Sequence, residues 1–84
     1  MTTSLENEII YKMFRRRSLG GVHKSKEDIQ RWFRKDLRGA AKQALDRLVR
    51  LSLVVEKPTS YGRRYCLNRD RLREIKSLIE EYLE

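Results

Sequence analysis

The chain has 84 residues, of which 20 are Lys or Arg and 12 are Asp or Glu, so its net charge is +8 and its length predicts one small domain over residues 1–84. A single cysteine and a single histidine exclude a disulfide framework and a cysteine-based zinc site, so we expect no cofactor and a reducing, cytoplasmic setting. No apolar run approaches the roughly 20 residues that cross a bilayer, and the N-terminus lacks the pattern of a signal peptide.

The first predicted element is a helix over residues 4–17. Thr3 and Glu6 have the spacing of a capping box, in which a hydroxyl and a carboxylate accept the first free backbone N–H groups. Apolar residues then recur at helical intervals, and a pair of glycines at 20–21 predicts the end of the helix. The next two residues, 22–23, are too few for a separate strand, but they can pair with the edge of a later hairpin.

Two further helices are predicted at residues 26–35 and 37–51. Ser25 has the position of an N-cap for the first of them, and Asp36 has that position for the second. Each helix carries an apolar stripe that we expect to face the core. The stripes consist of Ile29, Trp32 and Phe33, and of Ala41, Ala44, Leu45, Leu48 and Leu51.

A hairpin follows, with strands at 53–57 and 63–67 and a loop rich in turn-forming residues. The expected cross-strand pairs are Val55 with Tyr65 and Leu53 with Leu67.

Asn68 predicts the cap of a fourth helix within residues 68–84, where apolar residues recur at helical spacing from Leu72 to Leu83. This stripe exceeds what the end of so small a domain is expected to bury against its own body. A homodimer through the fourth helix would cover the excess. The alternative is a monomer in which this helix packs back on the first one.

The positive charge lies unevenly along the chain. Residues 1–68 hold 16 basic and 7 acidic side chains, whereas residues 69–84 hold 4 basic and 5 acidic side chains. A positive field of this kind attracts polyanions and raises their rate of association. The charge therefore favours a nucleic acid as the partner of the first 68 residues, with an ordinary basic surface as the alternative.

The densest pattern lies between residues 44 and 67, where ALDRLVRLSLVVEK is followed by YGRRYCL. It resembles the winged helix-turn-helix superfamily, in which a recognition helix leads through a turn into a strand and a wing that closes on an aromatic-x-Leu strand. Over essentially the whole chain, the element order is similar to that of small archaeal and bacterial transcriptional regulators of this superfamily. Two departures are Ser52, where many relatives have Gly, and the turn at residues 35–38, which lacks the usual Gly-Leu-Ser sequence.

The resemblance implies a mainly α fold with a small antiparallel sheet, in the order helix, strand, helix, helix, strand, strand, helix. It also implies that the third helix enters the major groove of double-stranded DNA. Because Arg bonds guanine and Gln bonds adenine, the residues expected nearest the bases are Arg38, Lys42 and Gln43, with Arg47 farther along the groove or on phosphate. Asp46 would repel phosphate unless a neighbouring cation one turn away neutralises it. An ordinary solvated helix face is the alternative.

Two more groups of residues are candidates for contact with nucleic acid. In the hairpin, alternation sends Arg63 and Arg64 to opposite faces, so that one can reach a phosphate or the minor groove while the other crosses the hairpin. Protection of an exposed strand edge is the alternative reading of these charges. At the start of the second helix, backbone N–H groups and flanking lysines suit a phosphate. The candidates are Lys57, Tyr61, Arg63 and Arg64 in the wing, and Lys24, Ser25 and Lys26 before the second helix.

The function that these patterns favour is a DNA-binding regulator of transcription that works without a cofactor. The alternative is a winged-helix module that binds RNA or an acidic protein partner within a larger complex. An enzyme is not expected, because the sequence offers no paired carboxylates in an apolar pocket, no glycine-rich phosphate loop and no cysteine–histidine constellation.

Overall fold

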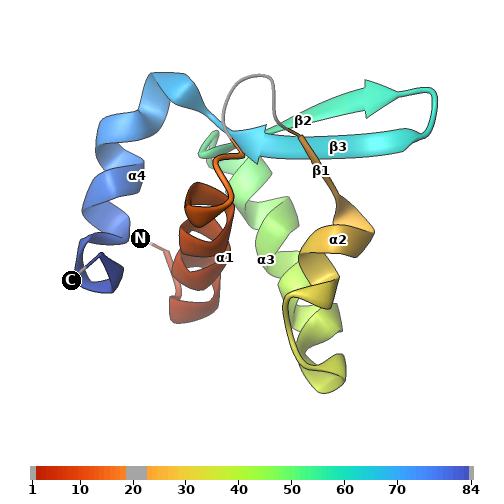
Figure 1. The fold of residues 1–84 in the computed structure, drawn as a ribbon, viewed down its shortest axis with the longest axis horizontal. Coiled ribbons are helices and arrows are strands. Elements are labelled where there is room, and N and C mark those ends of the chain that lie inside the picture. Colours follow the sequence, from red (N-terminus) through yellow and green to blue (C-terminus); the bar gives the residue numbers. More distant parts are fainter. Residues whose placement is uncertain (1, 19–22, 84) are drawn as a thin grey trace.

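The computed structural model describes residues 2–18 and 23–83, and its elements lie in the predicted order (Figure 1). A mainly helical body carries a small three-stranded antiparallel sheet, so the predicted fold class, with the element order of a winged helix, is confirmed. The helices are α1 (Ser4–Arg15), α2 (Lys26–Arg31), α3 (Arg38–Arg50) and α4 (Leu72–Leu78), and the strands are β1 (Lys24–Ser25), β2 (Val54–Thr59) and β3 (Gly62–Leu67). Three short 3₁₀ turns are η1 (Lys35–Leu37), η2 (Arg69–Arg71) and η3 (Glu80–Tyr82).

The predicted capping box begins α1. The Glu6 N–H donates to Thr3 Oγ1 at 3.2 Å, and the Thr3 N–H donates to Glu6 Oε1 at 2.9 Å. The helix ends two residues earlier than predicted, because Arg17 takes a left-handed conformation (φ 54°) and the Ser18 N–H bonds back to the Met13 carbonyl. The glycines at 20–21, which were expected to end this helix, lie outside the described residues.

Ser52 ends α3 by the same kind of motif. Its φ is 63°, its N–H donates to the Val49 carbonyl at 3.0 Å, and the Leu53 N–H donates to the Leu48 carbonyl at 3.1 Å. The Asn68 side chain holds the turn from outside by donating to the Ser52 carbonyl at 2.7 Å. Serine therefore occupies the left-handed position that glycine fills most easily, and the chain still turns directly from α3 into β2.

The connection between α2 and α3 differs from the prediction. Ser25 caps α2 as expected, since its Oγ accepts the Asp28 N–H at 3.1 Å. The helix ends at Arg31 rather than at residue 35, and Asp36 does not cap α3. Asp36 instead lies within η1 and pairs with Arg34 at 2.8 Å, which lowers the pKa of its carboxyl group.

The sheet has the strand order β1-β3-β2. The predicted hairpin register is wrong by one residue, because Val55 pairs with Cys66 and Leu67 pairs with Val54. The hairpin turns through two residues, Ser60 and Tyr61, and is closed by the pair Thr59 and Gly62, with Gly62 at φ +114°. A two-residue loop excludes the expected pairs, which need an odd number of loop residues.

The expected short strand before α2 forms at Lys24–Ser25 rather than at 22–23, and it pairs with β3. His23 is not part of it, and residue 22 lies outside the described residues. The register between β1 and β3 places Lys24 opposite Tyr65 and Ser25 opposite Arg64. The chain just before α2 is thereby fixed to the middle strand of the sheet.

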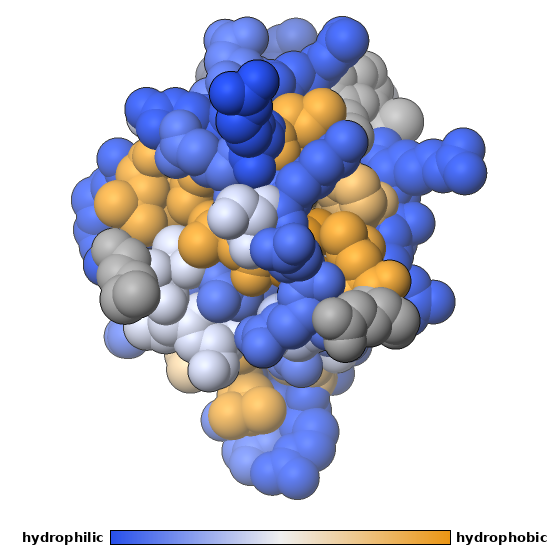
Figure 2. Space-filling view, turned by 90° about the vertical axis from the view of Figure 1, so that its left-hand side faces the viewer, coloured by the Kyte–Doolittle hydropathy of each residue, from blue (hydrophilic) through white to orange (hydrophobic). Residues whose placement is uncertain are grey.

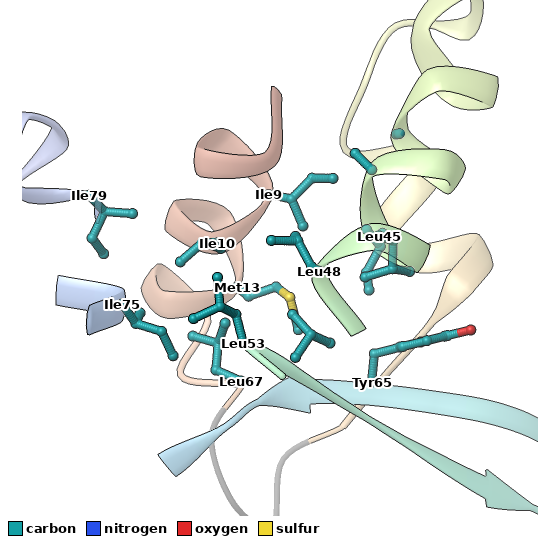
Figure 3. Packing of buried hydrophobic residues seen from close by; sticks show 14 of the residues in the cluster. Ile9, Ile10, Met13, Leu45, Leu48, Leu53, Tyr65, Leu67, Ile75 and Ile79 are labelled. Carbon is teal, nitrogen blue, oxygen red and sulfur yellow. The ribbon is translucent and has the colours of Figure 1, made fainter. Parts of the chain in front are cut away.

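The core lies where α1, α3, α4 and the base of the hairpin meet (Figure 3). Apolar side chains of α1 fill the space between α3 on one side and α4 on the other. The fully buried large residues of the core include Ile9, Ile10, Met13, Leu45, Leu48, Leu67, Ile75 and Ile79. The α3 stripe is confirmed except for Leu51, which is 36% exposed at the end of the helix, beside an open groove that Leu53 and Leu78 also line.

The C-terminal segment is less regular than predicted. Asn68 caps η2, because its Oδ1 accepts the Asp70 N–H at 3.0 Å, and the regular helix α4 is only seven residues long. Its apolar residues are used within the chain: Ile75 and Ile79 are fully buried, and the Tyr82 ring stacks on Tyr11 with centroids 5.2 Å apart. The chain itself therefore covers part of the predicted stripe, while Leu72 and Leu78 remain partly exposed.

Seen from the side of α4, the surface shows apolar patches interrupted by hydrophilic side chains (Figure 2). Leu83, which is 50% exposed, is the residue of the predicted stripe that remains most open. Among residues 2–18 and 23–83, no helix has both the length and the apolar character needed to cross a bilayer.

Candidate nucleic-acid interface

The exposed face of α3 is formed by residues that point away from its apolar stripe. Lys42 and Gln43 are exposed, and nothing lies within 4 Å of the space that a side chain on Gly39 would enter. Arg38 begins the helix and is half-buried, with its carbonyl accepting a bond from the Gln30 side chain at 3.1 Å. Lys42 and Gln43 therefore offer accessible donors, whereas the Nε atom of Arg38 is buried and has no hydrogen-bond partner within the described residues.

Arg47 lies on the side of α3 that faces α1. Its Nη1 atom is 2.6 Å from Oε1 of Glu6, whose side chain is only 4% exposed, whereas the Arg47 side chain is 38% exposed. The same carboxylate oxygen accepts the Thr3 N–H. A buried carboxylate of this kind is tolerated because it is paired and hydrogen-bonded. Arg47, predicted to reach along a groove of DNA, is thus held by α1 in the free chain.

The hairpin of β2 and β3 projects beyond the helices as a wing (Figure 1). Because directly paired residues share a face of the sheet, the register divides the wing into an inner and an outer face. The inner face is the one on which the core residues Val54 and Leu67 lie at the base of the hairpin. The outer face holds Lys57 opposite Arg64. At the tip, the Tyr61 side chain is 90% exposed.

The inner face of the wing carries an interacting group of polar side chains. Arg63 forms an ion pair with Glu56 across the hairpin. Tyr65 follows on the same face, fully buried, with its hydroxyl pointing away from the labelled apolar side chains (Figure 3). The Lys26 ammonium lies 6.0 Å from the centre of the Tyr65 ring.

The Tyr65 hydroxyl makes no well-aligned hydrogen bond within the described residues. Burial, reinforced by the negative charges of Glu56 and Asp46, raises the pKa of Tyr65 to about 12. Asp46 of α3 is thus one of the two carboxylates whose negative charge acts on the Tyr65 hydroxyl. No local sequence pattern indicates this group, although a correct hairpin register would have placed Glu56 and Tyr65 together.

A groove joins two of the predicted groups that are far apart in sequence. The start of α2 contributes Ser25, Lys26 and Glu27, and the wing contributes Tyr61, Gly62 and Arg63. The pairing of β1 with β3 brings these segments together. Lys24 lies in β1, directly opposite Tyr65. The candidates before α2 and those in the wing are therefore neighbours on one surface.

The predicted cations divide by whether they have an acidic partner. Arg47 and Arg63 are paired with Glu6 and Glu56. In residues 2–18 and 23–83, no carboxylate lies within ion-pair distance of the other predicted cations, which are Lys24, Lys26, Arg38, Lys42, Lys57 and Arg64. Most of the positive charge predicted to meet a nucleic acid is thus uncompensated in the free chain.

Comparison with known proteins gives no further guide. No protein-family model matches the chain, and neither the curated proteins nor the solved structures contain a significant match.

Proposed function

We propose that the chain binds double-stranded DNA as a winged helix regulator of transcription. In this proposal α3 enters the major groove, while the wing lies on the backbone or in the adjacent minor groove. The observation that carries the proposal is the uncompensated charge: six predicted cations from β1, α2, α3 and the wing have no acidic partner in the described part of the chain. Phosphates are the partners that such a surface attracts.

The dimensions of α3 support this mode of binding. An α-helix with its side chains is about 10–12 Å across, which fits the major groove of B-DNA at about 12 Å. The open first turns of α3 would bring Lys42 and Gln43 to the base edges, where a good bidentate pair discriminates by about 1–3 kcal/mol. Lys57 and Arg64, which carry no base-specific geometry, would contribute mainly to affinity.

Pairing of two copies through α4 stays a prediction. The apolar residues available for it are few, because Ile75 and Ile79 are already buried within one chain. Sedimentation of the free protein and of its DNA complex measures whether one or two copies bind.

The proposal is tested by fluorescence anisotropy titration of a random-sequence duplex at several salt concentrations. We expect the logarithm of the binding constant to fall linearly with the logarithm of salt concentration, because phosphate contacts release counterions. Arg64→Glu in the wing is expected to weaken binding to every duplex by about tenfold or more. Arg73→Glu changes the net charge equally on the exposed side of α4 and is expected to have a much smaller effect.

Two results would contradict the proposal. One is equal loss of affinity in Arg64→Glu and Arg73→Glu, which would mean that only total charge matters. The other is binding of single-stranded RNA or of polyglutamate as tightly as duplex DNA, which would favour the interaction module instead.

A further inference from the structure

A carboxylate lies in the middle of the exposed face of α3, where a surface that only bound phosphate would not keep one. Asp46 is one helical turn after Lys42 and one turn before Arg50, so both cations are in reach for an i, i+4 pair. Neither pair forms: within the described residues Asp46 has no ion pair and no hydrogen bond. Glu6 and Glu56 have arginine partners, whereas Glu8 and Glu27, like Asp46, have no ion pair within the described residues.

Asp46 is also held in place. It is half-buried in the middle of a 13-residue helix, and the neighbouring residues Leu45 and Leu48 anchor that helix in the core. Its negative charge is also one of the causes that raise the pKa of the buried Tyr65 hydroxyl on the inner face of the wing. A short side chain on a fixed helix is a rigid acceptor rather than a mobile surface charge.

A carboxylate accepts hydrogen bonds and cannot donate them. In the major groove, guanine offers only acceptors on its edge, and thymine offers an acceptor and a methyl group. Adenine offers a donor beside an acceptor, and the acceptor repels a carboxylate. Cytosine offers the N4 amino group as a donor and has no acceptor of its own on this edge, so it is the base whose edge best suits a carboxylate.

We propose that Asp46 is a specificity-determining residue that accepts a hydrogen bond from the N4 amino group of a cytosine and excludes the other bases at that position. The inference rests on the proposed function, since it needs α3 in the major groove. Lys42, about 6 Å earlier along the helix, supplies the complementary donor for a guanine within one or two base pairs. The surrounding positive field lets the carboxylate approach the duplex, and its own charge rejects bases that present acceptors.

The test is selection of bound sequences from a random duplex library, followed by anisotropy titration of the selected duplex and its single-base variants. For the wild-type chain, we expect one position to be enriched in cytosine, with replacement of that base weakening binding about tenfold. Asp46→Ala is expected to lose that preference while binding random duplex more tightly, because a negative charge has been removed from the face. Asp46→Asn is nearly the same size, and it is expected to shift the preference at that position towards adenine, which Asn can bond in two places.

Glu80→Ala is the matched control, since it removes one negative charge from the exposed C-terminal turn η3. It is expected to keep the cytosine preference of the wild-type chain. Thermal melts of each variant show that the fold is retained. An unchanged base preference in both Asp46 variants, with duplex binding intact, would overturn this inference and leave the proposed function standing. Failure of the wild-type chain to bind any duplex would overturn both.

Discussion

On the side of α3 that faces α1, Arg47 is paired with the buried Glu6, whereas on the exposed side Lys42 and Asp46 have no partner within the described residues. The wing repeats this contrast, with Arg63 paired to Glu56 on its inner face and Arg64 unpaired on its outer face. In both pairs it is the carboxylate that is largely buried, with side-chain exposures of 4% for Glu6 and 22% for Glu56, and a buried charge is tolerated when it is paired. The unpaired charges are therefore the ones available to a ligand.

The largest expected effect comes from breaking the paired side of α3. Arg47→Ala would leave the Glu6 carboxylate buried without its cation, so we expect a loss of about 3 kcal/mol in the free energy of unfolding, measured by urea denaturation. Lys42→Ala removes an exposed, unpaired cation and is expected to change stability by less than about 0.5 kcal/mol while weakening duplex binding. Equal destabilisation by the two substitutions would remove the distinction between the two sides.

Periodicity and capping rules were sufficient to predict the element order and most of the core. Amphipathic stripes such as Ala41 to Leu48 are read along one helix, and the caps at Thr3 and Ser25 depend on residues within three positions. These signals are local, and the structure confirms them.

Long-range features could not be predicted in the same way. Arg47 and Glu6 are 41 residues apart, and no local pattern indicates that they meet. The hairpin register depended on whether the loop has an even or an odd number of residues, and an error of one residue concealed the inner face on which Glu56 and Tyr65 lie. The sequence therefore predicted which residues are basic and exposed, but not which of them the fold already uses.

An intermediate effect is expected at high pH on the inner face of the wing. The pKa of Tyr65 is raised to about 12 by burial and by nearby negative charge, against about 10 in an unfolded chain. The folded chain therefore holds the hydroxyl proton more tightly than the unfolded chain does, so stability is unaffected by this group below pH 10 and falls as the pH rises towards 12. Urea denaturation measures the free energy of unfolding of the wild-type chain and of Tyr65→Phe. We expect the difference between the two to change by about 1–2 kcal/mol between pH 9 and 12. A constant difference across this range would mean that Tyr65 is not shielded from water.

The smallest effect, and the sharpest test of the contrast, is to convert a paired cation into an unpaired one. Glu56→Gln removes the charge that holds Arg63 across the hairpin. If paired cations are withheld from the ligand, freeing Arg63 should strengthen binding to all duplexes by a few-fold and should steepen the salt dependence by about one phosphate contact.

Glu27 supplies the control for this substitution, because it lines the same groove as Arg63 but forms no ion pair within the described residues. Glu27→Gln removes an equal charge from the same neighbourhood without releasing any cation. It should therefore raise affinity less than Glu56→Gln and leave the salt slope nearly unchanged. If the two variants behave alike in both affinity and salt slope, then Arg63 is equally available whether paired or not, and the pairing on the inner face has no bearing on binding.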